Sequence, residues 1–109
     1  MSYSVLVLDM FHCGDLDERD RVVGDFPDEA SAAAYARART WDSVEELRKP
    51  GQTHEELRQL WFALGEDALV LGGNYKGADE VDYFIDHPAN ASQRDWTRLT
   101  PSAIAATAG

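Results

Sequence analysis

The chain has 109 residues, one cysteine and three histidines, and its acidic residues outnumber its basic residues by ten. This length suffices for one domain that folds without metal, and a single cysteine excludes an internal disulfide, so a cytoplasmic protein is expected. A net charge of −10 disfavours direct nucleic-acid binding, and the short apolar run before Asp9 suits neither a signal peptide nor a membrane span.

The acidic charge is concentrated in two stretches. Residues 1–29 hold eight acidic residues against two arginines, and residues 66–86 hold six against one lysine, whereas residues 30–65 are neutral. Both acidic stretches also have the patterning of strands. The sequence therefore predicts a neutral helical layer joined to a sheet whose loops and edges are anionic.

The first elements are a strand pair followed by a helix. Apolar and β-branched residues dominate 3–12, which predicts a long central strand, and residues 21–26 predict a shorter strand that returns antiparallel to it. Asp28 has the position of an N-cap for a helix that ends before Pro50 and has an apolar face of small residues, which favours close packing on the sheet. A second capping-box pattern, which begins at Ser43, leaves open an interruption of this helix.

The second half repeats this order in reverse. Thr53 and Glu56 predict a capping box for a helix over 54–64 that ends at Gly65. Residues 68–71 predict a short buried strand, and the alternating residues 80–86 predict a further strand after a glycine-rich turn.

Together these elements predict an α+β fold in the order ββααββ, with a four-stranded, mostly antiparallel sheet and helices on one of its faces. Residues 1–100 are expected to form the single domain and 101–109 an alanine-rich tail. Trp96 and Leu99 are expected to anchor the segment after the last strand to the rest of the domain.

Because side chains alternate along a strand, the first strand has two distinct faces. Leu6, Leu8 and Met10 form an all-apolar face that we expect the helices to cover. The opposite face, together with the acidic loop after it, is the predicted interaction surface, and its residues are Val5, Val7, Asp9, Phe11, Asp82, Phe84, Asp15, Asp17 and Glu18. So much apolar area indicates contact with a second copy or another protein, or cover by Trp96 or the second helix of the same chain.

One cluster combines the side-chain types that bind metals: Asp9, His12, Asp15 and Asp17. Asp9 and His12 would point to opposite faces of a strand, so no metal site and no cofactor are predicted. Acidic neighbours oppose ionisation of Cys13 beside His12, and the glycine-rich residues 72–77 lack the following helix that a phosphate cradle needs. His54 and His87 are expected at the surface.

No catalytic set converges in this sequence, and the leading hypothesis is therefore a non-enzymatic, acidic interaction module. Its partner would be a basic protein surface, as for an inhibitor or immunity-type protein, or a second copy of the chain. The alternative is a small enzyme or ligand-binding domain with a pocket between sheet and helices or at a dimer seam. That alternative would use Asp9, His12 and Tyr83 as its polar groups.

Overall fold

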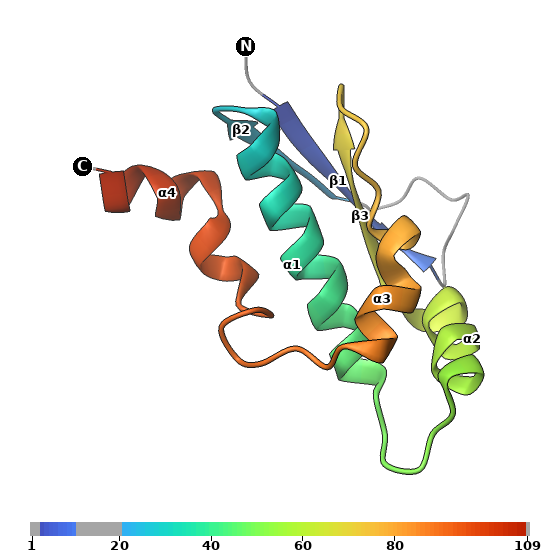
Figure 1. Ribbon diagram of the computed structural model, residues 1–109. Helices are drawn as coiled ribbons and strands as arrows, with labels where there is room; N and C mark the ends of the chain where they lie inside the picture. Colours follow the sequence, from blue (N-terminus) through green and yellow to red (C-terminus); the bar gives the residue numbers. More distant parts are fainter. Residues whose placement is uncertain (1–2, 11–20, 109) are drawn as a thin grey trace.

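The computed structural model describes residues 3–10 and 21–108 of the chain. Three antiparallel strands form one sheet in the order β2-β1-β3, and a long helix crosses one face of it (Figure 1). The elements, with two 3₁₀ turns labelled η, are β1 (Tyr3–Asp9), β2 (Arg21–Phe26), α1 (Glu29–Leu47), α2 (His54–Leu64), β3 (Glu66–Leu71), η2 (Gly77–Glu80), α3 (Val81–Asp86), η3 (Trp96–Leu99) and α4 (Pro101–Ala108).

The central position of β1 is confirmed. Val5 pairs with Val23 of β2 on one side and with Val70 of β3 on the other. The register of β1 with β2 shifts between Tyr3 and Val5, where Asp25 has a φ of 70° in the left-handed region. This bulge bends the exposed edge strand, a feature that discourages pairing with other strands.

Helix α1 begins where the sequence predicts. The Asp28 side chain accepts a hydrogen bond of 2.8 Å from the Ser31 amide and so caps the first turn. The helix continues past Trp41 without interruption. The hydroxyl of Ser43 does not act as a cap, because it accepts hydrogen bonds from the Trp61 indole and the Glu66 amide.

Helix α2 begins with the predicted capping box. The Glu56 amide donates to the Thr53 hydroxyl at 3.1 Å, and the Thr53 amide donates to the Glu56 carboxylate at 3.0 Å. The helix ends at Gly65, whose amide donates to the Trp61 carbonyl.

The prediction of a strand over 80–86 is wrong, because these residues form the end of η2 and all of α3. Val81, Phe84 and Ile85 are spaced so that one helical face buries all three. Phe84 stacks on Trp41 with ring centroids 5.1 Å apart. The α+β class is confirmed, but the sheet has three strands in the described part of the chain, so the ββααββ order does not hold.

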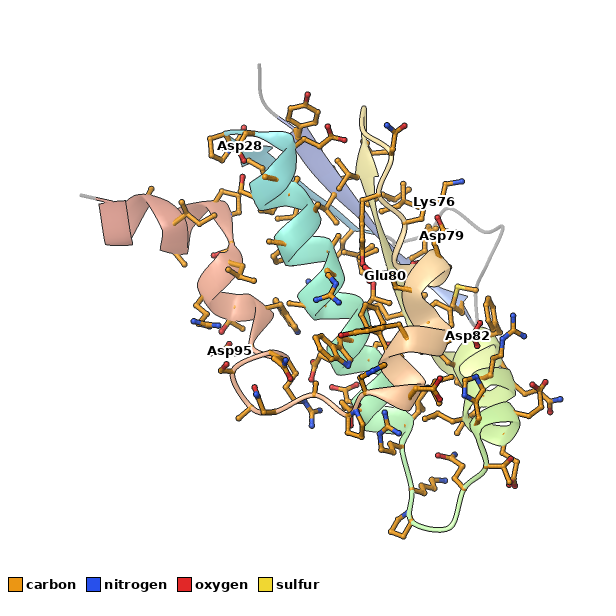
Figure 2. The ribbon with its side chains drawn as sticks, in the orientation of Figure 1. Asp28, Lys76, Asp79, Glu80, Asp82 and Asp95 are labelled. Carbon is orange, nitrogen blue, oxygen red and sulfur yellow. The ribbon has the colours of Figure 1, made fainter. Side chains whose placement is uncertain are left out.

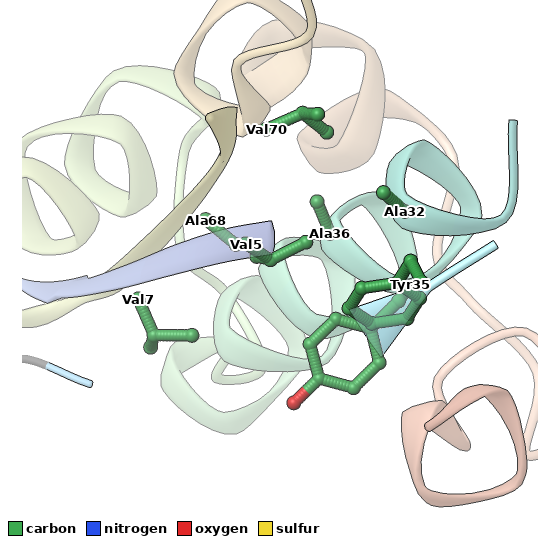
Figure 3. Packing of buried hydrophobic residues seen from close by; sticks show 8 residues of the cluster. Val5, Val7, Ala32, Tyr35, Ala36, Ala68 and Val70 are labelled. Atoms are coloured by element: carbon green, nitrogen blue, oxygen red, sulfur yellow. The ribbon is translucent and has the colours of Figure 1, made fainter. Parts of the chain in front are cut away.

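The core has two parts that meet along α1. The first joins the sheet to α1, where Ala32 and Ala36 allow the helix to approach Val5 and Val7 closely (Figure 3). The second joins the C-terminal half of α1 to α2 and α3, and its buried residues are Trp41, Val44, Leu57, Trp61, Val81, Phe84 and Ile85.

The prediction of which sheet face the helices cover is also wrong. Val5 and Val7 are fully buried beneath α1, so the opposite face, with Leu6 and Leu8, is the one that α1 leaves open. Both faces of β1 are apolar, and the small residues Ala32 and Ala36 of α1 belong to the same buried cluster as Val5 and Val7. Figure 1 shows no described helix crossing this second face.

Candidate interaction surface

The strand register aligns apolar side chains from all three strands on the sheet face opposite α1. Leu6 pairs with Val22 on one side and with Leu69 on the other. Val22 is 61% exposed and Leu71 40% exposed, whereas the other members are partly buried. We call this surface the open sheet face, and it consists of Leu6, Leu8, Val22, Leu69 and Leu71.

The open sheet face carries little charge for a chain with a net charge of −10. Asp67 lies opposite Leu8 in the register, but its side chain is turned into the protein and accepts hydrogen bonds from the amides of Ala68 and Ala78. Burial raises the pKa of Asp67 above its ordinary value. At the outer side of β3, Lys76 forms an isolated bridge with Leu69 and is exposed.

Only part of the predicted interaction surface matches this arrangement. Val5, Val7 and Phe84 are buried in the core, so they are not exposed on either sheet face. Asp82 belongs to α3 and not to the sheet (Figure 2). Four predicted residues lie outside the described residues: Phe11, Asp15, Asp17 and Glu18.

Asp9, the remaining predicted residue, lies beside a groove at the ends of β1 and β3. The groove has a volume of about 290 Å³ and is lined by carboxylates of four residues, by Arg39 and by Trp96. Asp9 pairs with Glu66 across the strands. The carboxylate residues are Asp9, Asp42, Glu46 and Glu66.

Arg39 neutralises part of the negative charge of this groove. Its side chain is almost fully buried, donates to Glu66 at 2.8 Å and to the Tyr35 hydroxyl at 2.6 Å, and lies 4.1 Å from the centroid of the Trp96 ring. Burial alone would lower the pKa of Arg39, but the hydrogen bond and charge of Glu66 outweigh burial and raise it.

The segment after α3 is held on the other side of the groove. Asp42 accepts hydrogen bonds from Arg94 at 2.6 Å and from the Trp96 indole at 3.1 Å. Trp96 and Leu99 pack against the first core cluster, which confirms them as anchors. The groove therefore lies between α1 and the C-terminal segment, and ion pairs of Glu66 with Arg39 and of Asp42 with Arg94 neutralise part of its charge.

Sequence reasoning missed Arg39 and His54. Arg39 follows Tyr35 by one helical turn on the buried side of α1, and this spacing was the available signal. His54 contacts Asp82 and Asp86, which are four residues apart on a segment that the sequence analysis interpreted as a strand.

The structure places the two described residues of the enzymatic alternative, Asp9 and Tyr83, at different sites. Asp9 lies beside the groove. Tyr83 lies in α3 and stacks on the ring of His87, the C-cap residue of that helix, with centroids 4.0 Å apart. His12 lies outside the described residues. Among the described residues, no group of three or more His, Cys, Asp or Glu side chains could hold a metal ion.

No helix within the described ranges is long and apolar enough to cross a membrane. Comparison with protein-family models, with curated proteins and with solved structures found no match to the chain.

Proposed function

We propose that the protein is a non-enzymatic interaction module that self-associates through the open sheet face. The observation that carries the proposal is the row of apolar side chains across β2, β1 and β3, with Val22 and Leu71 well exposed. Contiguous exposed apolar area of this kind is typical of protein interfaces.

A second copy is the partner that the charge distribution favours. Two chains of net charge −10 repel each other over most of their surfaces, but the open sheet face presents apolar side chains and turns Asp67 inward. A twofold dimer would bring two such faces together, and twofold dimers are the commonest homo-oligomers.

The area of the face sets the expected strength of the dimer. Three strands about 4.8 Å apart and six residues long cover roughly 300 Å² in projection. A stable interface needs about 800 Å² from each partner. We therefore expect a weak dimer that forms in proportion to concentration unless neighbouring surface adds to the contact.

A paired substitution tests the proposal. Val22→Lys places a charge on the open sheet face, whereas Leu64→Lys makes the same change of charge at a half-exposed leucine of α2. We expect Val22→Lys to raise the dimer dissociation constant at least about tenfold, because each dimer would bury two lysines. Sedimentation equilibrium over a concentration series measures this constant. Equal effects of the two substitutions would contradict the proposal.

A basic protein surface is the second candidate partner, supported by the acidic residues that η2 and α3 expose. Asp79 and Asp82 lie on these two elements (Figure 2), within a stretch of six acidic residues and one lysine. Such a contact would be driven by charge and would weaken as salt increases. Self-association through an apolar face would not weaken in this way.

A further inference from the structure

The first residue of α2 lies between two carboxylates of α3. The Nε2 atom of His54 is 2.8 Å from the Asp82 Oδ1 atom, and its Nδ1 atom is 2.8 Å from the Asp86 Oδ1 atom. Asp82 and Asp86 are four residues apart and therefore share a face of α3. One imidazole thus bridges two carboxylates that lie one turn apart on the neighbouring helix.

This geometry requires a particular protonation state. An ionised carboxylate only accepts hydrogen bonds. Each ring nitrogen of His54 must therefore carry a hydrogen and donate a hydrogen bond for both contacts to form. A neutral imidazole has one donor and one acceptor, and its unprotonated nitrogen would face a carboxylate oxygen. The paired contacts at 2.8 Å are therefore those of an imidazolium ion.

Other charged groups surround this contact. Arg58, one turn along α2, donates to Asp82 Oδ1 at 3.1 Å. Arg48 and Lys49, between α1 and α2, line a cavity of about 350 Å³ whose wall also includes His54 and Asp86. Arg48 is bound to Glu45 and to the carbonyls of Phe84 and Ile85. The other titratable side chains nearby are Glu55, Glu56 and His87. Each of them is hydrogen-bonded to a residue other than His54.

We propose that His54 is a proton-operated latch that holds the start of α2 against α3 when the imidazole is charged and releases it when the imidazole is neutral. Deprotonation removes the donor at one ring nitrogen, so only one of the two hydrogen bonds to α3 can persist, and it loosens the part of the cavity wall that His54 and Asp86 form. The latch joins elements within one chain, so it does not depend on the open sheet face.

The pKa shifts define the pH range in which the latch is closed. The hydrogen bonds that His54 donates to Asp82 and then to Asp86 raise the pKa of His54 above 6.5, so its stabilisation is complete below pH 6.5 and is lost as pH rises through the raised value. The His54 hydrogen bond lowers the pKa of Asp82 below 3.8, so that stabilisation is present above pH 3.8 and is lost as pH falls through the lowered value. The latch is fully closed between these two ordinary values.

Two measurements on the full chain test the latch. NMR titration of the histidine ring protons should give His54 a pKa above 6.5 that falls toward the ordinary value in Asp86→Asn. Hydrogen-exchange protection factors, corrected for intrinsic rates, should fall several-fold at the start of α2 between pH 5.5 and 8.5, and this fall should be absent in His54→Gln.

Matched controls separate the latch from general effects of charge and pH. Asp79→Asn removes the same charge from η2 and should leave the pKa of His54 unchanged, and His87→Gln should leave the α2 protection profile unchanged. A His54 pKa at or below 6.5 would overturn the proposal. So would the same pH dependence of α2 protection in His54→Gln as in the parent chain.

Discussion

At the scale of single residues, the Ser43 hydroxyl connects three elements. It lies on α1, is buried, and accepts hydrogen bonds from the Trp61 indole of α2 at 2.8 Å and from the Glu66 amide of β3 at 2.9 Å. The same serine pattern also occurs at helix starts, which is why the sequence alone is compatible with a helix cap at Ser43. The burial of Trp61 beside this hydroxyl decides between the two roles.

We expect Ser43→Ala to destabilise the protein, because it removes the acceptor for both donors. Each buried donor left without a partner costs about 1–3 kcal/mol, so the free energy of unfolding should fall by about 2 kcal/mol or more in urea unfolding. Thr40→Val is the matched control, since the buried Thr40 hydroxyl only donates to the Ala36 carbonyl of its own helix. A larger loss from Thr40→Val than from Ser43→Ala would contradict this account of α1.

At the scale of elements, a sequence pattern predicts an element correctly where only one type of secondary structure fits that pattern. Asp28, Thr53 and Glu56 have the cap roles predicted for them, because a cap depends on residues three positions apart. The alternation over 80–86 was ambiguous, because Val81, Phe84 and Ile85 also lie on one side of a helix. Burial against Trp41 and Trp61 selects the helix, and a local pattern does not contain that information.

The choice of sheet face could not be predicted for a similar reason. Val5 and Val7 alternate with Leu6 and Leu8, so both faces of β1 are apolar and hydrophobicity alone does not distinguish them. The deciding contact is the close approach of Ala32 and Ala36 on α1, which lie far away in the sequence. The alternation along β1 thus predicted a second apolar face, left open between a partner and cover by the same chain, but assigned Val5 and Val7 to it although both are buried beneath α1.

The packing of η2 against α1 gives a prediction at this scale. A Cβ atom on Gly77 would lie 2.7 Å from both the Cβ and Cγ2 atoms of Thr40, so the two elements meet too closely for a larger residue. We expect Gly77→Ala to lower the free energy of unfolding by about 1–3 kcal/mol, measured by urea unfolding.

Gly24→Ala is the control for this prediction. Its added Cβ would meet only the Ser4 hydroxyl at 3.5 Å, an ordinary contact. We expect a change within about 1 kcal/mol at Gly24. Equal stability of the parent chain and Gly77→Ala would show that η2 does not pack on α1 as described.

At the scale of the whole molecule, charge and apolar surface are separated. The net charge of −10 opposes association over most of the surface, while the open sheet face carries exposed apolar side chains from three strands. Added salt screens the repulsion between copies and strengthens apolar contact. Binding to a basic partner would have the opposite dependence on salt, so this dependence distinguishes the two proposed partners.

The most direct test of the central claim is the solution mass of the unmodified chain, measured by light scattering over a concentration series at low and high salt. The account predicts that the mass rises from one chain of 12.1 kDa toward two as concentration increases, and that it rises at lower concentration when salt is high. A mass of one chain under all these conditions would contradict self-association through the open sheet face.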